Sequence, residues 1–136
     1  MVCHLCEVQK KGAHVIKKTK NAFVCMNYQP IVKGHIMILP IKHKKSYKDL
    51  TKEEAKEMFL LVQEMSLVLR KTFNKGATLT AINHGKTQSE EHIHMHVMPD
   101  SENQKFIKDS FNSPARKIAE EKDLQLLKTK IIKGLN

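Results

Sequence analysis

The sequence has no tryptophan, and only 5% of its 136 residues are aromatic. It lacks any apolar run near the roughly 20 residues that a membrane-spanning helix requires, so we expect no membrane span. The first twelve residues, MVCHLCEVQKKG, lack the continuous apolar stretch of a secretory signal. Cysteine is scarce as well. Three cysteines, an odd number, argue against a disulfide-stabilised secreted domain and favour a reduced, cytoplasmic protein.

The length and composition predict one folded domain over residues 1–136. Hydrophobic residues make up 40% of the chain, which is too many for wholesale disorder. The formal net charge is +10, and residues 1–50 hold ten lysines against Glu7 and Asp49. This excess indicates either an anionic partner or a solvated lysine surface. Because aromatic residues do not alternate with the lysines, a nucleic-acid partner is disfavoured.

The pattern of apolar residues predicts an α+β fold. Apolar residues at three- and four-residue spacing predict a helix from Thr51 to about residue 73, opened by a capping box with Glu54 and closed by Gly76. The pair Ser113-Pro114 is typical of the start of a last helix. Alternating or continuous apolar runs predict strands at residues 13–18, 21–27, 35–41, 77–83 and 92–98.

Eight histidines is a high number for this length, and three of them alternate with apolar residues in the segment HIHMHVM. On a strand, His92, His94 and His96 would share one face. The Cα atoms of His92 and His96 would then lie about 13 Å apart, so one metal ion could not easily bind all three side chains. Divided roles are favoured: a ligand or structural partner, a nucleophile and a proton donor.

Two cysteines at the amino terminus form a second pattern. Cys3 and Cys6 have the C-x-x-C spacing with which two thiolates bind one zinc ion. A redox function would need a strand before the first cysteine, and only two residues precede it. A zinc site is therefore the better interpretation, and it needs two more ligands, of which histidine is the expected type.

Together these motifs resemble the histidine triad (HIT) superfamily. HIHMHVM matches the alternating histidine signature of that family, and further matches lie upstream in the family's order. The matching positions are Asn27, Pro30, Gly34-His35, Pro40 followed by His43, Asn83, and Gln88-Ser89. The resemblance covers about residues 3–98. It implies a mainly antiparallel sheet with one long helix and a C-terminal helix, and a homodimer that binds a purine nucleotide.

The resemblance also implies a role for each matching residue. His94 corresponds to the nucleophile that attacks the α-phosphate, His96 to the group that assists the leaving group, and His35 to the histidine that supports the triad. The implied nucleotide contacts are Asn27 at the ribose, Gln88 and Ser89 at phosphate, and Asn83 in the site, together with His94 and His96. The implied structural zinc ligands are Cys3, Cys6, His43 and His92.

The sequence leaves the substrate open. A nucleotide phosphohydrolase or nucleotidyl transferase with a nucleotidyl-histidine intermediate is the first hypothesis, and it could act on dinucleoside polyphosphates or on nucleoside phosphoramidates. A non-catalytic nucleotide or nucleic-acid binding protein of the same fold is the alternative. The loop that holds Gln88 departs from the family pattern, and Asp100 stands where the family often has arginine.

Overall fold

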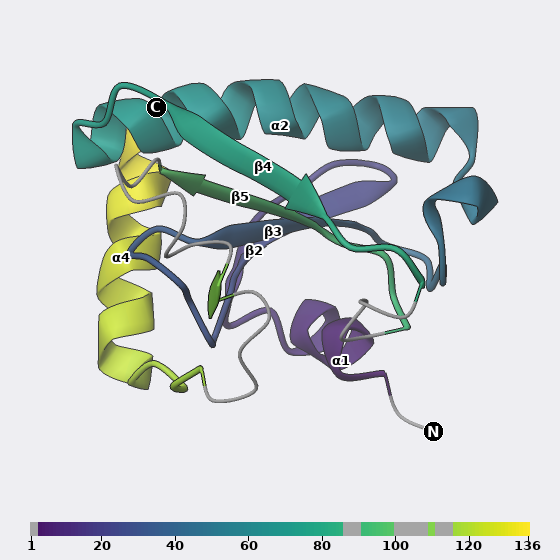
Figure 1. Ribbon diagram of the computed structural model, residues 1–136, viewed down its shortest axis with the longest axis horizontal. Coiled ribbons are helices and arrows are strands. Elements are labelled where there is room, and N and C mark those ends of the chain that lie inside the picture. The colour runs from purple at the N-terminus through teal and green to yellow at the C-terminus, as the bar shows by residue number, and fades with distance from the viewer. Residues whose placement is uncertain (1–2, 86–90, 100–108, 111–115) are drawn as a thin grey trace.

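The computed structural model describes residues 3–85, 91–99, 109–110 and 116–136. Its centre is an antiparallel sheet in the order β1-β2-β3-β5-β4 (Figure 1). The strands are β1 (Val15–Lys18), β2 (Ala22–Met26), β3 (Ile36–Pro40), β4 (Thr78–Ile82) and β5 (Met95–Pro99). The helices are α1 (His4–Lys11), α2 (Lys52–Phe73) and α4 (Glu121–Gly134), with a 3-10 turn at Tyr47–Asp49. The α+β fold predicted from the sequence is confirmed.

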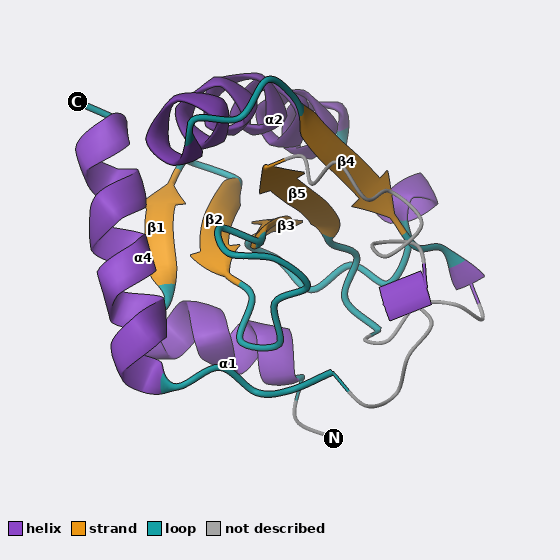
Figure 2. Ribbon diagram, turned by 60° about the vertical axis from the view of Figure 1, so that its left-hand side comes forward, coloured by secondary structure: helices purple, strands orange, loops and turns teal. Residues whose placement is uncertain are grey.

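Strand alternation divides the core into two layers. One face of the sheet packs against the long helix α2 and against α4, through Val24, Ile38 and Val97 on the strands and Met65 and Leu69 on α2. The opposite face is covered near the amino terminus by α1, whose Leu5 packs with the fully buried side chains of Phe23, Cys25 and Leu39. Figure 2 shows α1 and α2 on opposite sides of the strands, with α4 beside β1.

The register of β5 determines where the triad histidines lie. His96 pairs with Met37 of β3, and Met37 belongs to the layer covered by α1. The neighbouring Val97 pairs with Ile36 and points into the layer under α2. Because alternate residues of a strand share a face, His96 projects toward the α1 side.

The long helix begins as predicted. Thr51 and Glu54 form the expected capping box, in which each side chain accepts a hydrogen bond from the other residue's backbone amide. The helix ends at Phe73, as the sequence predicted, but Gly76 is not the residue that closes it. Asn74, in the left-handed conformation with φ 52°, closes it two residues before Gly76. Asparagine tolerates this conformation better than most residues, so it can replace glycine at a helix end.

Two other boundaries differ from expectation. The sequence did not predict α1, which begins after Cys3 because the Cys3 sulfur accepts the backbone N–H of Cys6 at 3.3 Å. The last helix begins at Glu121, and the pair Ser113-Pro114 that was expected to open it lies outside the described residues. Residues 116–120 are not helical, since Ala119 instead donates its N–H to the carbonyl of Tyr28 at 2.8 Å. None of the helices in the described ranges is long and apolar enough to cross a membrane.

Candidate functional site

The three triad histidines separate into two environments. Only His96 lies within β5, whereas His92 and His94 precede the strand. The backbone there pairs with a loop, since Ile93 donates its N–H to the carbonyl of Lys44 at 2.7 Å. The His92 ring turns toward the amino-terminal cysteines, while His94 and His96 line a cavity. All three side chains are buried, with at most 3% of their surface exposed.

A chain of hydrogen bonds determines the proton positions on His35 and His96. The backbone N–H of Ile31 donates to Nδ1 of His35 at 3.1 Å, so the neutral His35 ring carries its proton on Nε2. His35 Nε2 lies 2.8 Å from His96 Nδ1, which therefore accepts that proton in a hydrogen bond. His96 consequently carries its own proton on Nε2. The backbone of one loop thus makes His96 Nε2 a hydrogen-bond donor.

His94 has the opposite tautomer. Its Nδ1 lies 2.9 Å from the carbonyl oxygen of His92, so Nδ1 carries the proton and donates it to that oxygen. Nε2 is then the nitrogen with the lone pair. The rings of His94 and His96 lie edge to face, with centroids 4.8 Å apart. A basic nitrogen and an N–H donor from neighbouring imidazoles therefore meet at one cavity.

Burial keeps these imidazoles neutral. Burial, with the positive charge of Arg116 as a second cause, lowers the pKa of His35 to about 3. Burial also lowers the pKa of His96 far below its usual range, with further contributions from His35, His94 and Arg116. His96 therefore presents an N–H donor to the cavity without a net charge.

The cavity has a volume of about 270 Å³ and is lined on one side by the histidines and on the other by the segment after β2. Asn27 is 3% exposed, and its Oδ1 accepts the N–H of Gln29 at 2.8 Å. Its Nδ2 approaches His35 Nε2 to 3.2 Å, and because both nitrogens carry hydrogen in the tautomer above, we treat this as a close contact. The described lining residues are His4, Leu5, Asn27, Tyr28, Gln29, Met37, His94, His96 and Arg116.

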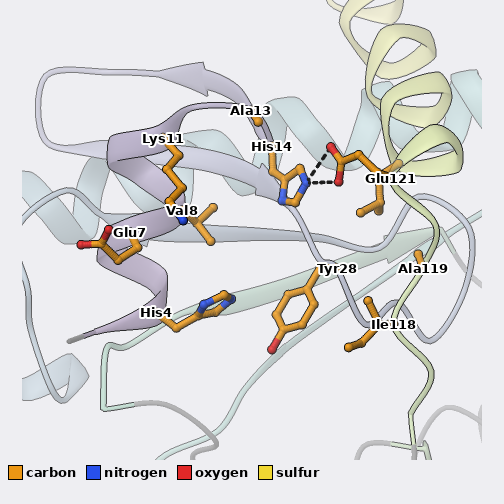
Figure 3. A pocket seen from close by; sticks show the side chains of 11 residues that line it. His4, Glu7, Val8, Lys11, Ala13, His14, Tyr28, Ile118, Ala119 and Glu121 are labelled. Atoms are coloured by element: carbon orange, nitrogen blue, oxygen red, sulfur yellow. Dashed lines mark hydrogen bonds and ion pairs between the residues drawn. The ribbon is translucent and has the colours of Figure 1, made fainter. Parts of the chain in front are cut away.

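A second cavity of about 250 Å³ adjoins the first, and both are lined by His4 and Tyr28 (Figure 3). The His4 and Tyr28 rings lie edge to face, with centroids 4.9 Å apart. Beyond them the walls include Val8, Ile118 and Leu124, and one end carries the pair of His14 and Glu121, joined at 2.8 Å. The two cavities, which share His4 and Tyr28, are together called the triad groove below.

The amino-terminal cysteines meet two histidines in a separate cluster. The possible ligand atoms of Cys3, Cys6, His43 and His92 all lie within 4.8 Å of one another. The three sulfur-to-nitrogen distances recorded among them are 3.4–3.5 Å. In a tetrahedral zinc site with bonds of about 2.3 Å to sulfur and 2.0–2.1 Å to nitrogen, such an edge measures about 3.6 Å. These three distances match the edges of a tetrahedral site, so the four side chains could hold a metal ion.

Contacts around the cluster support the same conclusion. His92 donates its Nε2–H to the carbonyl of Pro40 at 3.0 Å, which leaves Nδ1 as the nitrogen that faces the sulfurs. Burial and the neighbouring Cys3 thiol raise the pKa of Cys6 to about 11. The Cys6 thiol therefore stays protonated near neutral pH unless a cation displaces the proton. The third cysteine, Cys25, is fully buried in the layer under α1.

Comparison with known proteins decides the family. A model of the HIT domain matches residues 8–103, which is more than half of the chain. The chain belongs to the HIT family. The resemblance inferred from its motifs is confirmed.

Among the similar HIT proteins is the bis(5'-adenosyl)-triphosphatase of Dictyostelium discoideum, 33% identical over 91 residues that cover 65% of this chain and 61% of that protein. Another is the bis(5'-nucleosyl)-tetraphosphatase [asymmetrical] of Schizosaccharomyces pombe, 31% identical over 90 residues, with 65% and 50% covered. The chain thus spans less than two thirds of either relative. A solved structure of a Zn-bound histidine triad family protein from Mycobacterium smegmatis is 25% identical, with a TM-score of 0.74 and coverage of 98% and 95%.

Most residues expected in the HIT site come together, with three exceptions. Gln88 and Ser89 lie outside the described residues. Asn83 follows β4 and is half-buried, but it is not among the described residues that line the cavity. The sequence analysis also missed Arg116, which does line it. Composition was the feature of the sequence that could have drawn attention to Arg116, since Arg116 and Arg70 are the only arginines in a chain rich in lysine.

The buried imidazoles of the HIT site predict acid sensitivity. In the unfolded chain His35 and His96 take up protons below about pH 6.5, whereas in the folded chain their pKa values are far lower. As the pH falls below 6.5, the free energy of unfolding should therefore drop by about 1.4 kcal/mol per pH unit for each histidine. Urea unfolding at pH 7, 6 and 5 measures this slope. His96→Asn removes one of these histidines and should reduce the slope by about 1.4 kcal/mol per pH unit. An unchanged slope in that variant would contradict the assignment.

Proposed function

We propose that the chain is a nucleotide-binding phosphohydrolase or nucleotidyl transferase that cleaves its substrate at the α-phosphate through a nucleotidyl-histidine intermediate. The observation that carries this proposal is the 2.9 Å hydrogen bond from His94 Nδ1 to the carbonyl of His92, which leaves His94 Nε2 as a basic nitrogen beside a donor on His96. The names of the Dictyostelium and Schizosaccharomyces relatives support hydrolysis of a dinucleoside polyphosphate.

The chemistry follows from the tautomers. His94 Nε2 attacks the α-phosphorus, a nitrogen–phosphorus bond forms, and the bond from phosphorus to the leaving group breaks. His96 Nε2–H donates a hydrogen bond to the departing oxygen or nitrogen and stabilises its developing charge, while solvent supplies the proton that the departing group takes up. Water then attacks the phosphorus and loses its proton to solvent, and the nucleoside monophosphate leaves as the bond to His94 breaks. His35 takes no part in bond making, and its role is to position His96 through the 2.8 Å contact.

The triad groove could hold the nucleoside part of the substrate, its ribose and base. Asn27, beside His94 and His96 in the cavity wall, is placed to hold the ribose. The groove continues past His4 and Tyr28 to the apolar side chains near α4, where a purine base would be withdrawn from water (Figure 3). Asn83, Gln88 and Ser89 complete the proposed nucleotide contacts by their correspondence with the family.

The choice of substrate is testable with one panel. Diadenosine triphosphate and tetraphosphate are compared with adenosine and guanosine phosphoramidates in steady-state assays. Faster turnover of the dinucleotides would assign the chain to the same class of activity as the relatives' names. Nucleotide binding without turnover of any member would favour the alternative, a non-catalytic nucleotide-binding protein.

His94→Ala should abolish turnover and leave nucleotide affinity within about tenfold, because the lost group acts mainly in the transition state. Rapid-quench mass spectrometry of the unaltered chain should find a nucleotidyl adduct on the peptide that contains HIHMHVM. The comparison variant is His96→Asn, which should slow substrates with basic leaving groups more than those with good ones. Normal turnover by His94→Ala would refute the proposed nucleophile.

We further propose that Cys3, Cys6, His43 and His92 hold a structural zinc ion. Four protein ligands leave no open position for substrate or water, so the ion would stabilise the fold and not take part in the chemistry. The zinc site would link the start of α1 to the loop after β3 and to the segment before β5. It would also fix the backbone of His92, whose carbonyl orients the nucleophile.

Elemental analysis should find about one zinc ion per chain. Cys6→Ser should lose the ion and lower the melting temperature more than it alters the chemical step, because it removes a ligand and touches no substrate. Cys25→Ala is the matched control, since it changes a buried cysteine outside the cluster and should keep the zinc. Zinc-free protein whose stability does not respond to chelation would rule the site out.

The surface supports a homodimer. Phe59, Leu60 and Leu67 of α2 are 50–65% exposed, and β4 at the edge of the sheet carries Ile82 at 38%. Figures 1 and 2 both place α2 next to β4. An exposed edge strand beside exposed apolar side chains is a typical interface between two copies of a chain.

Sedimentation equilibrium should give a mass of about twice the 15.7 kDa of one chain. Leu67→Glu should shift the equilibrium toward the monomer, because it places a charge in the buried interface. Leu126→Glu makes the same change at a 62% exposed position on α4 and should leave the dimer intact. A monomeric unaltered chain at micromolar concentration would refute the dimer.

A further inference from the structure

The cavity that holds the proposed nucleophile is nearly free of fixed charge. His96 is neutral in the tautomer given above, and none of the ten lysines of residues 1–50 is among the described lining residues. One lining residue, Arg116, carries a permanent positive charge. A phosphate group bound beside the histidines would therefore meet its positive counterpart at Arg116.

Arg116 reaches the cavity from a distant part of the chain. It lies twenty residues after His96, in the non-helical segment before α4. Two hydrogen bonds dock this segment on the loop after β2: Gln29 Nε2 donates to the carbonyl of Arg116 at 3.2 Å, and Ala119 N–H donates to the carbonyl of Tyr28 at 2.8 Å. Both bonds involve the backbone of the segment, so the guanidinium is not needed to hold it.

The guanidinium has the environment of an anion ligand. Its residue is half-buried, and none of the ion pairs found among the described residues involves it. Burial lowers the pKa of Arg116, whose charge in turn lowers the pKa values of His35 and His96. The positive charge thus acts on the neighbouring histidines, and it is partly withdrawn from water without an ion pair to any carboxylate of the described residues.

We propose that Arg116 is the cationic phosphate ligand of this site, supplied by the segment before α4. This inference rests on the proposed function and adds a residue that the triad motif does not contain. Asp100, where the family often has arginine, cannot serve an anion in this way. A guanidinium from the carboxyl-terminal segment would take over that charge, and its planar donors suit two phosphate oxygens at once.

The test compares ligands with and without phosphate. Calorimetry measures the binding of inorganic pyrophosphate, adenosine monophosphate and adenosine to the unaltered chain and to Arg116→Gln. We expect Arg116→Gln to weaken the two phosphate ligands by about tenfold or more and adenosine by less than about twofold. Arg116→Lys should fall between, because it keeps the charge and loses the bidentate geometry. Lys117→Gln removes an exposed neighbouring charge and should change none of the three affinities.

The remaining outcomes either overturn the role of Arg116 or separate it from the proposed nucleotide function. Equal weakening of adenosine and the phosphate ligands, or a lowered melting temperature in Arg116→Gln, would show a structural role and overturn the proposal. Unchanged pyrophosphate affinity, or no pyrophosphate binding by the unaltered chain, would overturn it as well. Arg116-dependent binding of pyrophosphate without any binding of adenosine monophosphate would support the anion site and count against the proposed nucleotide function.

Discussion

The backbone N–H of Ile31 fixes the proton positions on which the site depends. Because it donates to His35 Nδ1, His35 must donate from Nε2 to His96, and His96 must carry its own proton on Nε2. A second backbone group, the carbonyl of His92, sets the opposite tautomer in His94. Two neighbouring imidazoles thus become a base and a donor through backbone contacts.

These hydrogen bonds work only because the rings are buried. In water an imidazole exchanges tautomers freely and titrates near neutral pH, whereas His35 and His96 are at most 3% exposed and their pKa values are strongly lowered. Burial in turn depends on the strand register, which directs His96 toward the α1 side together with Met37. Gly34, which precedes His35, lets the chain pass close to the Phe73 ring. Its φ is 89°, and a Cβ atom there would lie 2.6 Å from that ring.

A neutral imidazole does not compensate the negative charge of a phosphate. A cationic side chain such as Arg116 is needed for that. None of the lysines of residues 1–50 lines the cavity at His94 and His96: Lys17 pairs with Glu64 at 2.7 Å, Lys44 pairs with Glu54 at 3.6 Å, and Lys11 lines the second cavity. Net charge therefore indicated an anionic partner but did not locate the group that would meet it. Among the described lining residues, the one fixed cation comes from a segment held by contacts to Tyr28 and Gln29.

Local rules in the sequence determined the strands, the capping box of α2 and the alternation of the triad, because strand and helix periodicity are properties of neighbouring residues. They also made a C-x-x-C metal site the natural interpretation of Cys3 and Cys6. The resemblance to the HIT family already divided His92 from His94 and His96, but only the tertiary structure showed the contacts that turn the rings apart: His92 toward Pro40 and Cys6, and His96 toward His35. Likewise, only the tertiary structure placed Arg116 in the wall of the cavity. Its position depends on contacts across almost ninety residues, and no local pattern encodes such a distance.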